Sequence, residues 1–264
     1  MIEAPPLLSV ILTTRDRPRL LPLALRYYRE QTYQPRELLV VDDGAAHPAD
    51  DAAVHAVGGR LLRVPPGTPL GTKLDHGAAA ARGTLCQKMD DDDFYGPRFL
   101  ELMAGSWLAA AARPSLAFLM GFLFFDLARW EIRCSRPDNV PGASLLFARD
   151  DWRARPFRAL PGDEDTWFVR DQQRRGVSLL PVVAWGTFIA VRHAGAPTDR
   201  GHTWTHQSTG ETLEQHLRQQ PLLPNGPESV LPDWALAVYR ELHLGLGQPA
   251  TRVIAPERTP TAAP

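Results

Sequence analysis

Apolar, strand-like segments alternate with amphipathic, helix-like segments through the first 112 residues, and this alternation constrains the fold more than any other feature. The strand-like segments are residues 7–13, 37–41, 60–64 and 84–89. The helix-like segments that follow them are residues 16–31, 49–57, 70–82 and 97–112. This order predicts a parallel sheet with right-handed crossovers. We therefore expect an α/β fold with a Rossmann-like, mostly parallel central sheet flanked by helices.

The second half of the chain is less regular and predicts a smaller, mixed arrangement. Strand-like segments occur at residues 116–125, 130–134, 142–148 and 177–183, and helix-like ones at 163–175, 211–219 and 233–244. Because no linker separates the halves, we expect a single domain over residues 1–247. Its regular half would span about 7–112, and its mixed half about 113–247. Residues 248–264, which are rich in proline, are expected to form a disordered tail.

Composition excludes several classes of protein. The formal net charge of −1 gives no electrostatic footprint for nucleic acid or an anionic membrane. Cys86 and Cys134 provide neither a disulfide framework nor zinc-finger spacing, and they fit a reducing compartment. The N-terminus lacks the pattern of a signal peptide, and the apolar run 116–125 is too short to cross a bilayer. We therefore expect a cytoplasmic protein without a transmembrane segment.

Four consecutive aspartates at residues 90–93, the acidic run, follow the fourth predicted strand. Two like charges about 4 Å apart near a surface repel by about 4 kcal/mol, so the fold has to compensate this run. A divalent cation bound through carboxylate oxygens would do so, and a helix N-terminus just downstream would help. The alternative is a solvated acidic loop, or a helix cap before Pro97.

Two further acidic stations occur in the chain. Asp42 and Asp43 end the second strand, and residues 163–165 (Asp-Glu-Asp) open a predicted helix. Because ligands of open α/β sheets bind outside the carboxyl ends of the strands, we expect Asp42, Asp43 and the acidic run to line one site. Such a site suits a nucleoside diphosphate, with one acidic pair on the base or ribose and the other on a cation. Alternatively, residues 163–165 only place negative charge at a helix N-terminus.

Five segments, in this order along the chain, resemble the family-2 glycosyltransferases of the GT-A fold. They are residues 9–18 (SVILTTRDRP), 39–44 (LVVDDG), 70–83 (LGTKLDHGAAAARG), 88–95 (KMDDDDFY), which is similar to the DxD motif, and 164–170 (EDTWFVR), which is similar to the ED motif. The resemblance covers roughly residues 7–193. The third segment departs from the family's pattern at Leu74 and Asp75, where members often have Arg-Asn.

The resemblance implies a glycosyltransferase of the hexosyltransferase type. It would transfer a sugar from a nucleotide-diphosphate donor, a UDP-sugar by the family's habit, to an acceptor hydroxyl with inversion, in glycan or glycoconjugate synthesis. The implied cofactor is Mn²⁺ or Mg²⁺. The acceptor would be a glycan, a lipid-linked glycan or a small molecule, and a lipid-linked acceptor would make the enzyme peripheral to a membrane.

The resemblance makes residues 7–112 the nucleotide-binding half and residues 113–247 the acceptor and catalytic half, and it implies roles for individual residues. The expected nucleotide-binding residues are Thr13, Thr14, Arg15, Asp42, Asp43, Lys73, Asp90 and Asp91. The expected metal ligands are Asp92, as first choice, with Asp90 and His193, although a histidine at a strand end can equally be structural. The general base, which takes the proton of the acceptor hydroxyl, would be Glu164 or Asp165, with a slight preference for Asp165.

Two other functions are open alternatives. A nucleotidyltransferase that makes nucleotide sugars usually has a glycine-rich loop after its first strand, and residues 13–18 contain no glycine. A non-catalytic nucleotide-sugar-binding protein would not need the acidic pair Glu164 and Asp165. Both observations favour the glycosyltransferase.

Overall fold

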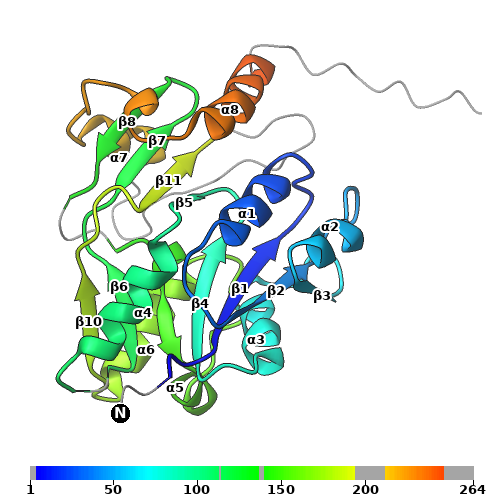
Figure 1. Ribbon diagram of the computed structural model, residues 1–264, viewed down its shortest axis with the longest axis vertical. Helices are drawn as coiled ribbons and strands as arrows, with labels where there is room; N and C mark the ends of the chain where they lie inside the picture. The colour runs from blue at the N-terminus through cyan, green and yellow to red at the C-terminus, as the bar shows by residue number, and fades with distance from the viewer. Residues whose placement is uncertain (1–3, 113, 137–139, 194–211, 247–264) are drawn as a thin grey trace, which may run out of the picture.

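The apolar runs of the first half form the centre of a seven-stranded sheet in the computed structural model, which describes residues 4–112, 114–136, 140–193 and 212–246 (Figure 1). Its strands in spatial order are β10 (Leu179–Val182), β6 (Leu116–Leu119), β9 (Leu146–Ala148), β4 (Leu85–Asp90), β1 (Leu8–Thr14), β2 (Arg36–Asp42) and β3 (Gly59–Arg63). All neighbours are parallel except β9, which runs antiparallel to β4 and β6. The predicted α/β class with a mostly parallel central sheet is confirmed.

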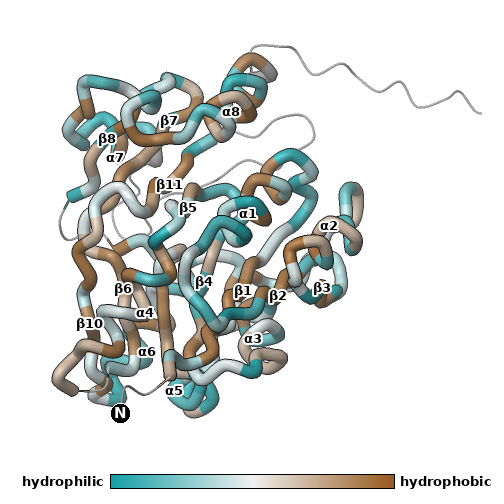
Figure 2. Tube along the Cα trace, in the orientation of Figure 1, coloured by the Kyte–Doolittle hydropathy of each residue, from teal (hydrophilic) through white to brown (hydrophobic). Residues whose placement is uncertain are grey.

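Helices cover both faces of this sheet. One face packs against α1 (Leu20–Arg29), α2 (Asp51–Ala56) and α4 (Phe99–Ala109), and the other against α3 (Leu70–Ala80), α5 (Arg149–Ala154) and α6 (Glu164–Arg174). Within β1, Val10 and Leu12 join the first core and Ile11 joins the second, because successive strand residues point to opposite faces. Strands covered on both faces need apolar residues throughout, and β1 and β2 are mainly brown in Figure 2.

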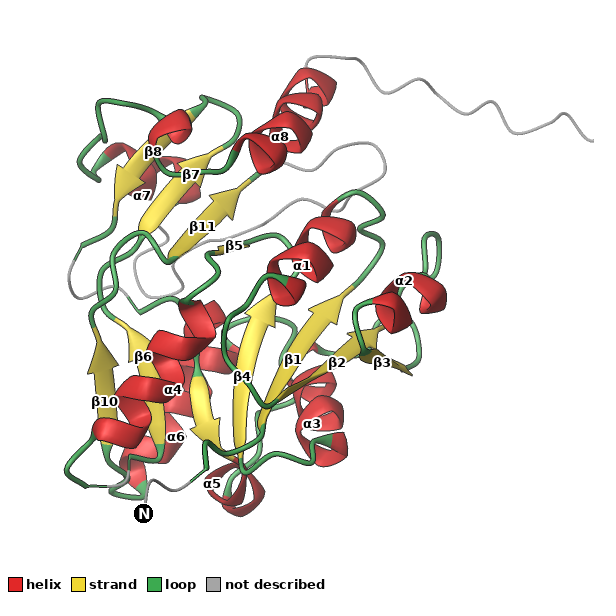
Figure 3. Cartoon of the chain, viewed as in Figure 1, coloured by secondary structure: helices red, strands yellow, loops and turns green. Residues whose placement is uncertain are grey.

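A second, four-stranded sheet lies beyond the carboxyl edge of the first, the edge to which β1 and β4 point (Figure 1). Its strands in order are β5 (Phe94–Tyr95), β11 (Phe188–Arg192), β7 (Leu123–Asp126) and β8 (Glu131–Cys134). Helices α7 (Leu213–Arg218) and α8 (Asp233–Leu246) flank this sheet (Figure 3). Short 3-10 turns η1 (Gly142–Ser144) and η2 (Pro227–Ser229) complete the described elements.

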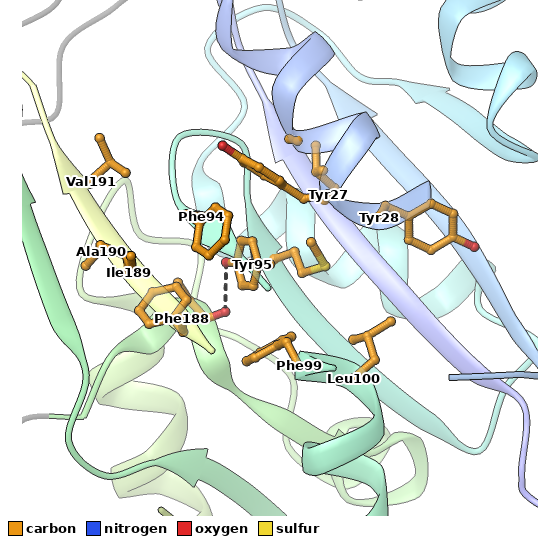
Figure 4. Close-up of a cluster of buried hydrophobic side chains, with 14 of the residues drawn as sticks. Tyr27, Tyr28, Phe94, Tyr95, Phe99, Leu100, Phe188, Ile189, Ala190 and Val191 are labelled. Carbon is orange, nitrogen blue, oxygen red and sulfur yellow. Dashed lines mark hydrogen bonds between the residues drawn. The ribbon is translucent and has the colours of Figure 1, made fainter. Parts of the chain in front are cut away.

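Aromatic side chains join the two sheets directly after the acidic run (Figure 4). The ring of Tyr95 lies 4.9 Å from that of Phe99 and 5.2 Å from that of Phe188, measured between centroids. Phe94 packs edge-on against Tyr27 of α1 at 5.0 Å. Strand β5 is therefore held between α1, α4 and β11. Since β5 follows the acidic run at once, the same contacts fix the position of the aspartates.

The second half differs from the expected elements in two places. The apolar run 116–125 gives two strands in different sheets, because the chain turns at Gly121, which has a φ of +74° that glycine adopts without strain. Segment 142–148 begins with η1, so only β9 is extended. The predicted tail, residues 248–264, lies outside the described residues. Among the described helices, none has the length and apolar character required to cross a membrane.

Candidate active site at the carboxyl edge

The strand register brings the predicted acidic stations of the central sheet together. Thr14 of β1 pairs with Asp42 of β2, and Thr13 pairs with Asp90 of β4. The three strands therefore end at the same level of the sheet, as expected for parallel neighbours. Thr13, Thr14, Asp42 and Asp43 are all buried, so the edge is a packed polar site and not a solvated loop.

Asp42 holds the turn that follows β2. One carboxylate oxygen accepts the Gly44 N–H at 2.8 Å, and the other accepts the Ala49 N–H at 2.8 Å and the Arg63 guanidinium at 2.9 Å. Both oxygens are thus engaged by the protein itself. A direct contact between Asp42 and a nucleotide base or ribose would have to share these acceptors, so the carboxylate shapes the pocket through the turn.

Asp43 forms a buried ion pair with Lys73 of α3. The Lys73 ammonium lies 2.7 Å from one Asp43 oxygen and donates to the Thr14 carbonyl at 3.2 Å. The other Asp43 oxygen accepts the Gly67 N–H at 3.1 Å and lies 3.7 Å from the Arg15 guanidinium. The structure therefore places four of the predicted nucleotide-binding residues in one cluster, with Arg15 at its partly exposed side.

Protein cations face each carboxylate of the acidic run. The Lys88 ammonium lies 3.3 Å from Asp90, and Arg17 Nη1 contacts Asp91 and lies 2.8 Å from Asp92. These pairs compensate the repulsion that the sequence led us to expect. The solvated-loop alternative does not hold, because Asp91, Asp92 and Asp93 are buried and Asp90 alone is partly exposed.

Asp93, the last residue of the run, is turned away from the sheet edge toward the second sheet. It accepts the Val191 N–H at 2.9 Å and the Arg192 guanidinium at 3.1 Å. Burial raises the pKa of the Asp93 carboxyl well above its usual range, even though Arg192 opposes this effect. Asp93 thus anchors β11 to the acidic run and brings the following residue, His193, into the site.

Asp91 and Asp92 occupy the centre of the site. Burial raises the pKa of Asp91, while Arg17 and the Thr14 side chain act in the opposite direction. Among the described residues, no hydrogen-bond partner reaches the buried Oδ2 of Asp91. The imidazole Nε2 of His193 lies 3.4 Å from Asp92 Oδ2. The structure therefore brings two of the expected metal ligands, Asp92 and His193, next to each other, while the third, Asp90, faces Lys88.

The donor atoms of Asp90, Asp92 and His193 are of types that Mn²⁺ and Mg²⁺ accept. Within the described ranges, however, no three acidic, histidine or cysteine side chains are already arranged around a common cation position. At Asp92, the Arg17 guanidinium lies where a cation would bind, since it contacts this carboxylate and that of Asp91. The residues fit a divalent ion in chemical type, and a rearrangement of side chains would complete the site.

Lys88 connects the acidic run to the helix that carries the candidate bases. This fully buried ammonium lies 3.1 Å from Glu164 Oε1 and 3.3 Å from Asp90. Burial raises the pKa of Glu164 to about 7, against the opposing charge of Lys88 and with smaller contributions from the charges of Asp165 and Asp90. The third acidic station therefore does more than charge a helix N-terminus, because it shares a lysine with the acidic run.

Asp165 differs from its neighbour in exposure. Its side chain is partly exposed, and one oxygen accepts the Thr166 N–H at 2.6 Å. The other oxygen lies against Gly142 of η1, where an added Cβ would come within 1.4 Å of it. Gly142 therefore makes room for the Asp165 carboxylate. Of the two candidate bases, Asp165 is open to an incoming molecule and Glu164 is enclosed.

Sequence reasoning missed the cations of the site, namely Arg17, Lys88 and Arg192. Lys88 carried a usable signal, since it stands two residues before Asp90 in a strand and so shares its face. The departure at Leu74 and Asp75 also has a structural explanation. Leu74 is buried in the core, and Asp75 accepts the Trp152 indole N–H at 2.6 Å.

Known proteins resemble this chain in part of its sequence and in its fold. Residues 9–115 match the model of the family described as "Glycosyl transferase family 2". No curated protein sequence matches the chain. Similar solved structures include a mannosyltransferase, PcManGT, from Pyrobaculum calidifontis in complex with GDP-Man and Mn²⁺ (18% identity, 68% of this chain and 56% of that chain, TM-score 0.49).

TarS from S. aureus is also similar, with 14% identity over 71% of this chain and 37% of that chain and a TM-score of 0.52. A TarS fragment in complex with UDP-GlcNAc has 13% identity over 72% of this chain and 62% of that chain, with a TM-score of 0.54. This chain thus spans between 37% and 62% of the length of these three structures. At such identities the likeness to TarS shows the fold, which is the GT-A type.

Proposed function

We propose that this chain, whose residues 9–115 match the model of glycosyl transferase family 2, transfers a sugar from a nucleoside-diphosphate donor to an acceptor hydroxyl, with inversion at the anomeric carbon. The observation that carries the proposal is the Lys88 bridge between Asp90 and Glu164. Inverting transfer needs a donor site and a general base side by side. The bridge holds the acidic run and the helix with the candidate bases against each other.

The donor would bind across the ends of β1, β2 and β4. Thr13, Thr14 and Arg15 would line the pocket for the base and ribose. Asp43, which Lys73 holds in place, would contact the same part of the donor. The unpartnered oxygen of Asp91 is a natural acceptor for a ribose hydroxyl, since a buried acceptor gains from a donor. We propose a UDP-sugar as donor, in keeping with the UDP-GlcNAc complex of the TarS fragment.

A divalent ion, Mn²⁺ or Mg²⁺, would be held by Asp92, Asp90 and His193. When bound, such an ion acts as a Lewis acid that stabilises the negative charge of a leaving diphosphate. The imidazole of His193 is already 3.4 Å from Asp92 and is buried with it, so these two residues need the least movement. Asp90 would join from the partly exposed side of the run.

We propose Asp165 as the general base. Its carboxylate would take the proton of the acceptor hydroxyl while the hydroxyl oxygen attacks the anomeric carbon. The bond from that carbon to the donor's terminal phosphate oxygen breaks, and the nucleoside diphosphate leaves with the electron pair. Glu164 would act as a positioning residue, because its side chain is buried and its Oε1 lies 3.1 Å from the Lys88 ammonium.

The proposed reaction also requires an acceptor, and the enzyme a cellular location. The acceptor would be a glycan, a lipid-linked glycan or a small molecule bound by the half of the chain that follows α4. We place the enzyme in the cytoplasm, supported by two free thiols, of which Cys86 is buried. One GT-A domain over residues 1–247 would contain both halves of the site.

An assay of donor turnover tests this function. The protein is incubated with UDP-, GDP- or dTDP-sugars and Mn²⁺ or Mg²⁺, and release of nucleoside diphosphate is followed with and without a chelator. We expect metal-dependent release with one donor class, and release about 10³-fold slower from the Asp92→Ala variant. Consumption of pyrophosphate with nucleotide-sugar loss would indicate the nucleotidyltransferase instead. Thermal stabilisation by a donor without any turnover would indicate a binding protein.

A further inference from the structure

We propose that Arg17 is a built-in counter-ion that occupies the cation position between Asp91 and Asp92 and has to move aside before a divalent ion binds. The inference rests on the proposed function for the identity of the ion. It goes further in assigning a role to Arg17, a residue outside the acidic run and outside the expected ligand set. It predicts that the free protein binds metal weakly and that a donor promotes metal binding.

The contacts of Arg17 carry the inference. A single nitrogen, Nη1, contacts Asp91 and lies 2.8 Å from Asp92 Oδ2, so one positive charge sits between two carboxylates. The Arg17 side chain is only 15% exposed, and both aspartates are more deeply buried. Asp92 Oδ2 is also the oxygen that lies 3.4 Å from His193 Nε2. The guanidinium therefore contacts the carboxylate oxygen that an ion held jointly by Asp92 and His193 would use.

The aspartates offer more acceptor capacity than Arg17 uses. Oδ2 of Asp91 is buried, and among the described residues it has no hydrogen-bond partner. The Arg17 guanidinium bonds to only some of the oxygens of these two carboxylates. A divalent ion, which accepts several oxygen ligands, can bind oxygens of both. The orphaned oxygen thus points to a ligand that the protein alone does not supply at this position.

The loop that carries Arg17 is firmly anchored, so its side chain is the part that can move. Asp16 has a φ of +50°, and one of its oxygens accepts the N–H groups of Ala45, Ala46 and His47 at 2.8–3.0 Å. These three bonds tie the loop after β1 to the loop after β2. The arrangement fixes the backbone on one side of Arg17, and Pro18 restricts it on the other.

Space for a displaced side chain lies beside Arg17. A cavity of about 120 Å³ is lined mainly by apolar residues, together with Arg17, Thr14, His47 and Asp50. The Asp50 side chain is the N-cap of α2 and accepts the Ala52 N–H. Arg17 can therefore leave the aspartates without unfolding the loop. A divalent ion and a guanidinium on the same carboxylate repel each other, and the negative diphosphate of a donor would relieve this repulsion.

Direct binding of Mn²⁺ to the full chain, followed by the electron paramagnetic resonance signal of the free ion, tests the inference without any nucleotide. We expect Arg17→Gln to bind Mn²⁺ at least about tenfold more tightly than the wild type, because a positive charge next to the ion is removed. Arg63→Gln is the matched control. It removes another arginine–aspartate pair of the same sheet edge, and its Mn²⁺ affinity should stay within about twofold of wild type.

The double variant Arg17→Gln/Asp91→Asn separates the position of the charge from its amount. It removes one positive and one negative charge, so the cluster keeps its net charge and folds even if Arg17→Gln alone does not. It should bind Mn²⁺ several-fold more tightly than Asp91→Asn alone, because these two variants differ only in the charge of residue 17. Equal or weaker binding by the double variant than by Asp91→Asn would overturn the proposal, as would Mn²⁺ binding by the wild type as tight as that of Arg17→Gln.

Failure of this inference is distinguishable from failure of the proposed function. The titration contains no sugar donor, so tighter Mn²⁺ binding by the variants stands whether or not the protein transfers sugar. Conversely, a wild type that turns over a nucleotide sugar, with Mn²⁺ affinities unaffected by Arg17, would refute the role of Arg17 alone.

Discussion

The acidic strand ends of β2 and β4 use the same residue type at the same edge of one sheet, yet they serve different purposes. After β2, both oxygens of Asp42 are taken up by two backbone N–H groups and Arg63. After β4, the carboxylates face cationic side chains, and one oxygen of Asp91 is left over. Carboxylates bonded to the backbone hold a turn, whereas carboxylates held by side-chain cations can exchange those cations for a ligand.

The comparison predicts its largest effect for Asp92→Ala. Removing this carboxylate should lower kcat for nucleoside-diphosphate release by about 10³-fold, because stabilisation of a leaving diphosphate by a metal contributes several kcal/mol. The melting temperature should stay near that of the wild type, which a thermal scan in the same buffer controls. Turnover within a few-fold of wild type would show that Asp92 is no more a ligand residue than Asp42.

Glu164 links α6 to the end of β4 through Lys88, and the pKa of Glu164 gives a second test. Since the pKa of Glu164 is raised to about 7 in the folded protein, stability from this group is present below about pH 4.5 and is lost as the pH rises through 7. The loss amounts to at most about 3 kcal/mol. Urea unfolding of wild type and Glu164→Gln between pH 5 and 8 should therefore show a flatter pH dependence for the variant. Parallel curves would show that burial does not raise the pKa of Glu164 in the folded protein.

The Asp42→Asn variant tests whether Asp42 stabilises the turn after β2. An amide cannot accept from Gly44, Ala49 and Arg63 together, so at least one donor loses its partner. We expect the free energy of unfolding to fall by about 1–3 kcal/mol, as is usual when a charged acceptor in a buried hydrogen-bond set is lost. Chemical denaturation measures this loss. A variant as stable as the wild type would mean that the turn after β2 does not depend on Asp42.

Arg63→Gln should have the smallest effect. The Arg63 side chain is 50% exposed, and solvent screens its pairing with Asp42. The cost in unfolding free energy should be below about 1 kcal/mol, measured in the same urea series. A loss of unfolding free energy as large as that of Asp42→Asn would mean that the ion pair, and not the backbone N–H groups, stabilises the turn. The two strand ends would then both depend on side-chain cations.

The central strands were predictable because their physical signal is local. Residues 8–14 (LSVILTT) contain no charged side chain and are buried throughout, since helices cover both faces of β1, and Gly44 marks the turn that follows β2. Strand β5 has two residues and no periodic pattern, so its existence depends on pairing with β11. The division of segment 116–125 at Gly121 could not be predicted either, because both resulting strands are apolar and no change of pattern marks the turn between them.

The site was predictable at the level of strand ends and not at the level of ion pairs. Parallel topology alone brings Asp42 and Asp90 to one edge, which the register confirms. The contact of Arg17 with Asp91 joins residues 74 positions apart and depends on how Asp16 anchors its loop. No pattern within either segment specifies that contact. The expectation that the acidic run needs compensation was correct, although protein cations supply much of it.

The central claim is that the acidic run and the N-terminus of α6 form one glycosyl-transfer site, and the Asp165→Asn variant tests it most directly. The measurement is kcat for nucleoside-diphosphate release, taken together with the Kd of the nucleoside diphosphate in the presence of Mn²⁺. Loss of the base should lower kcat by about 10²–10⁴-fold and leave the Kd within about twofold of wild type. A variant with wild-type kcat would contradict the account, because the carboxylate beside the acidic run would then take no part in the reaction.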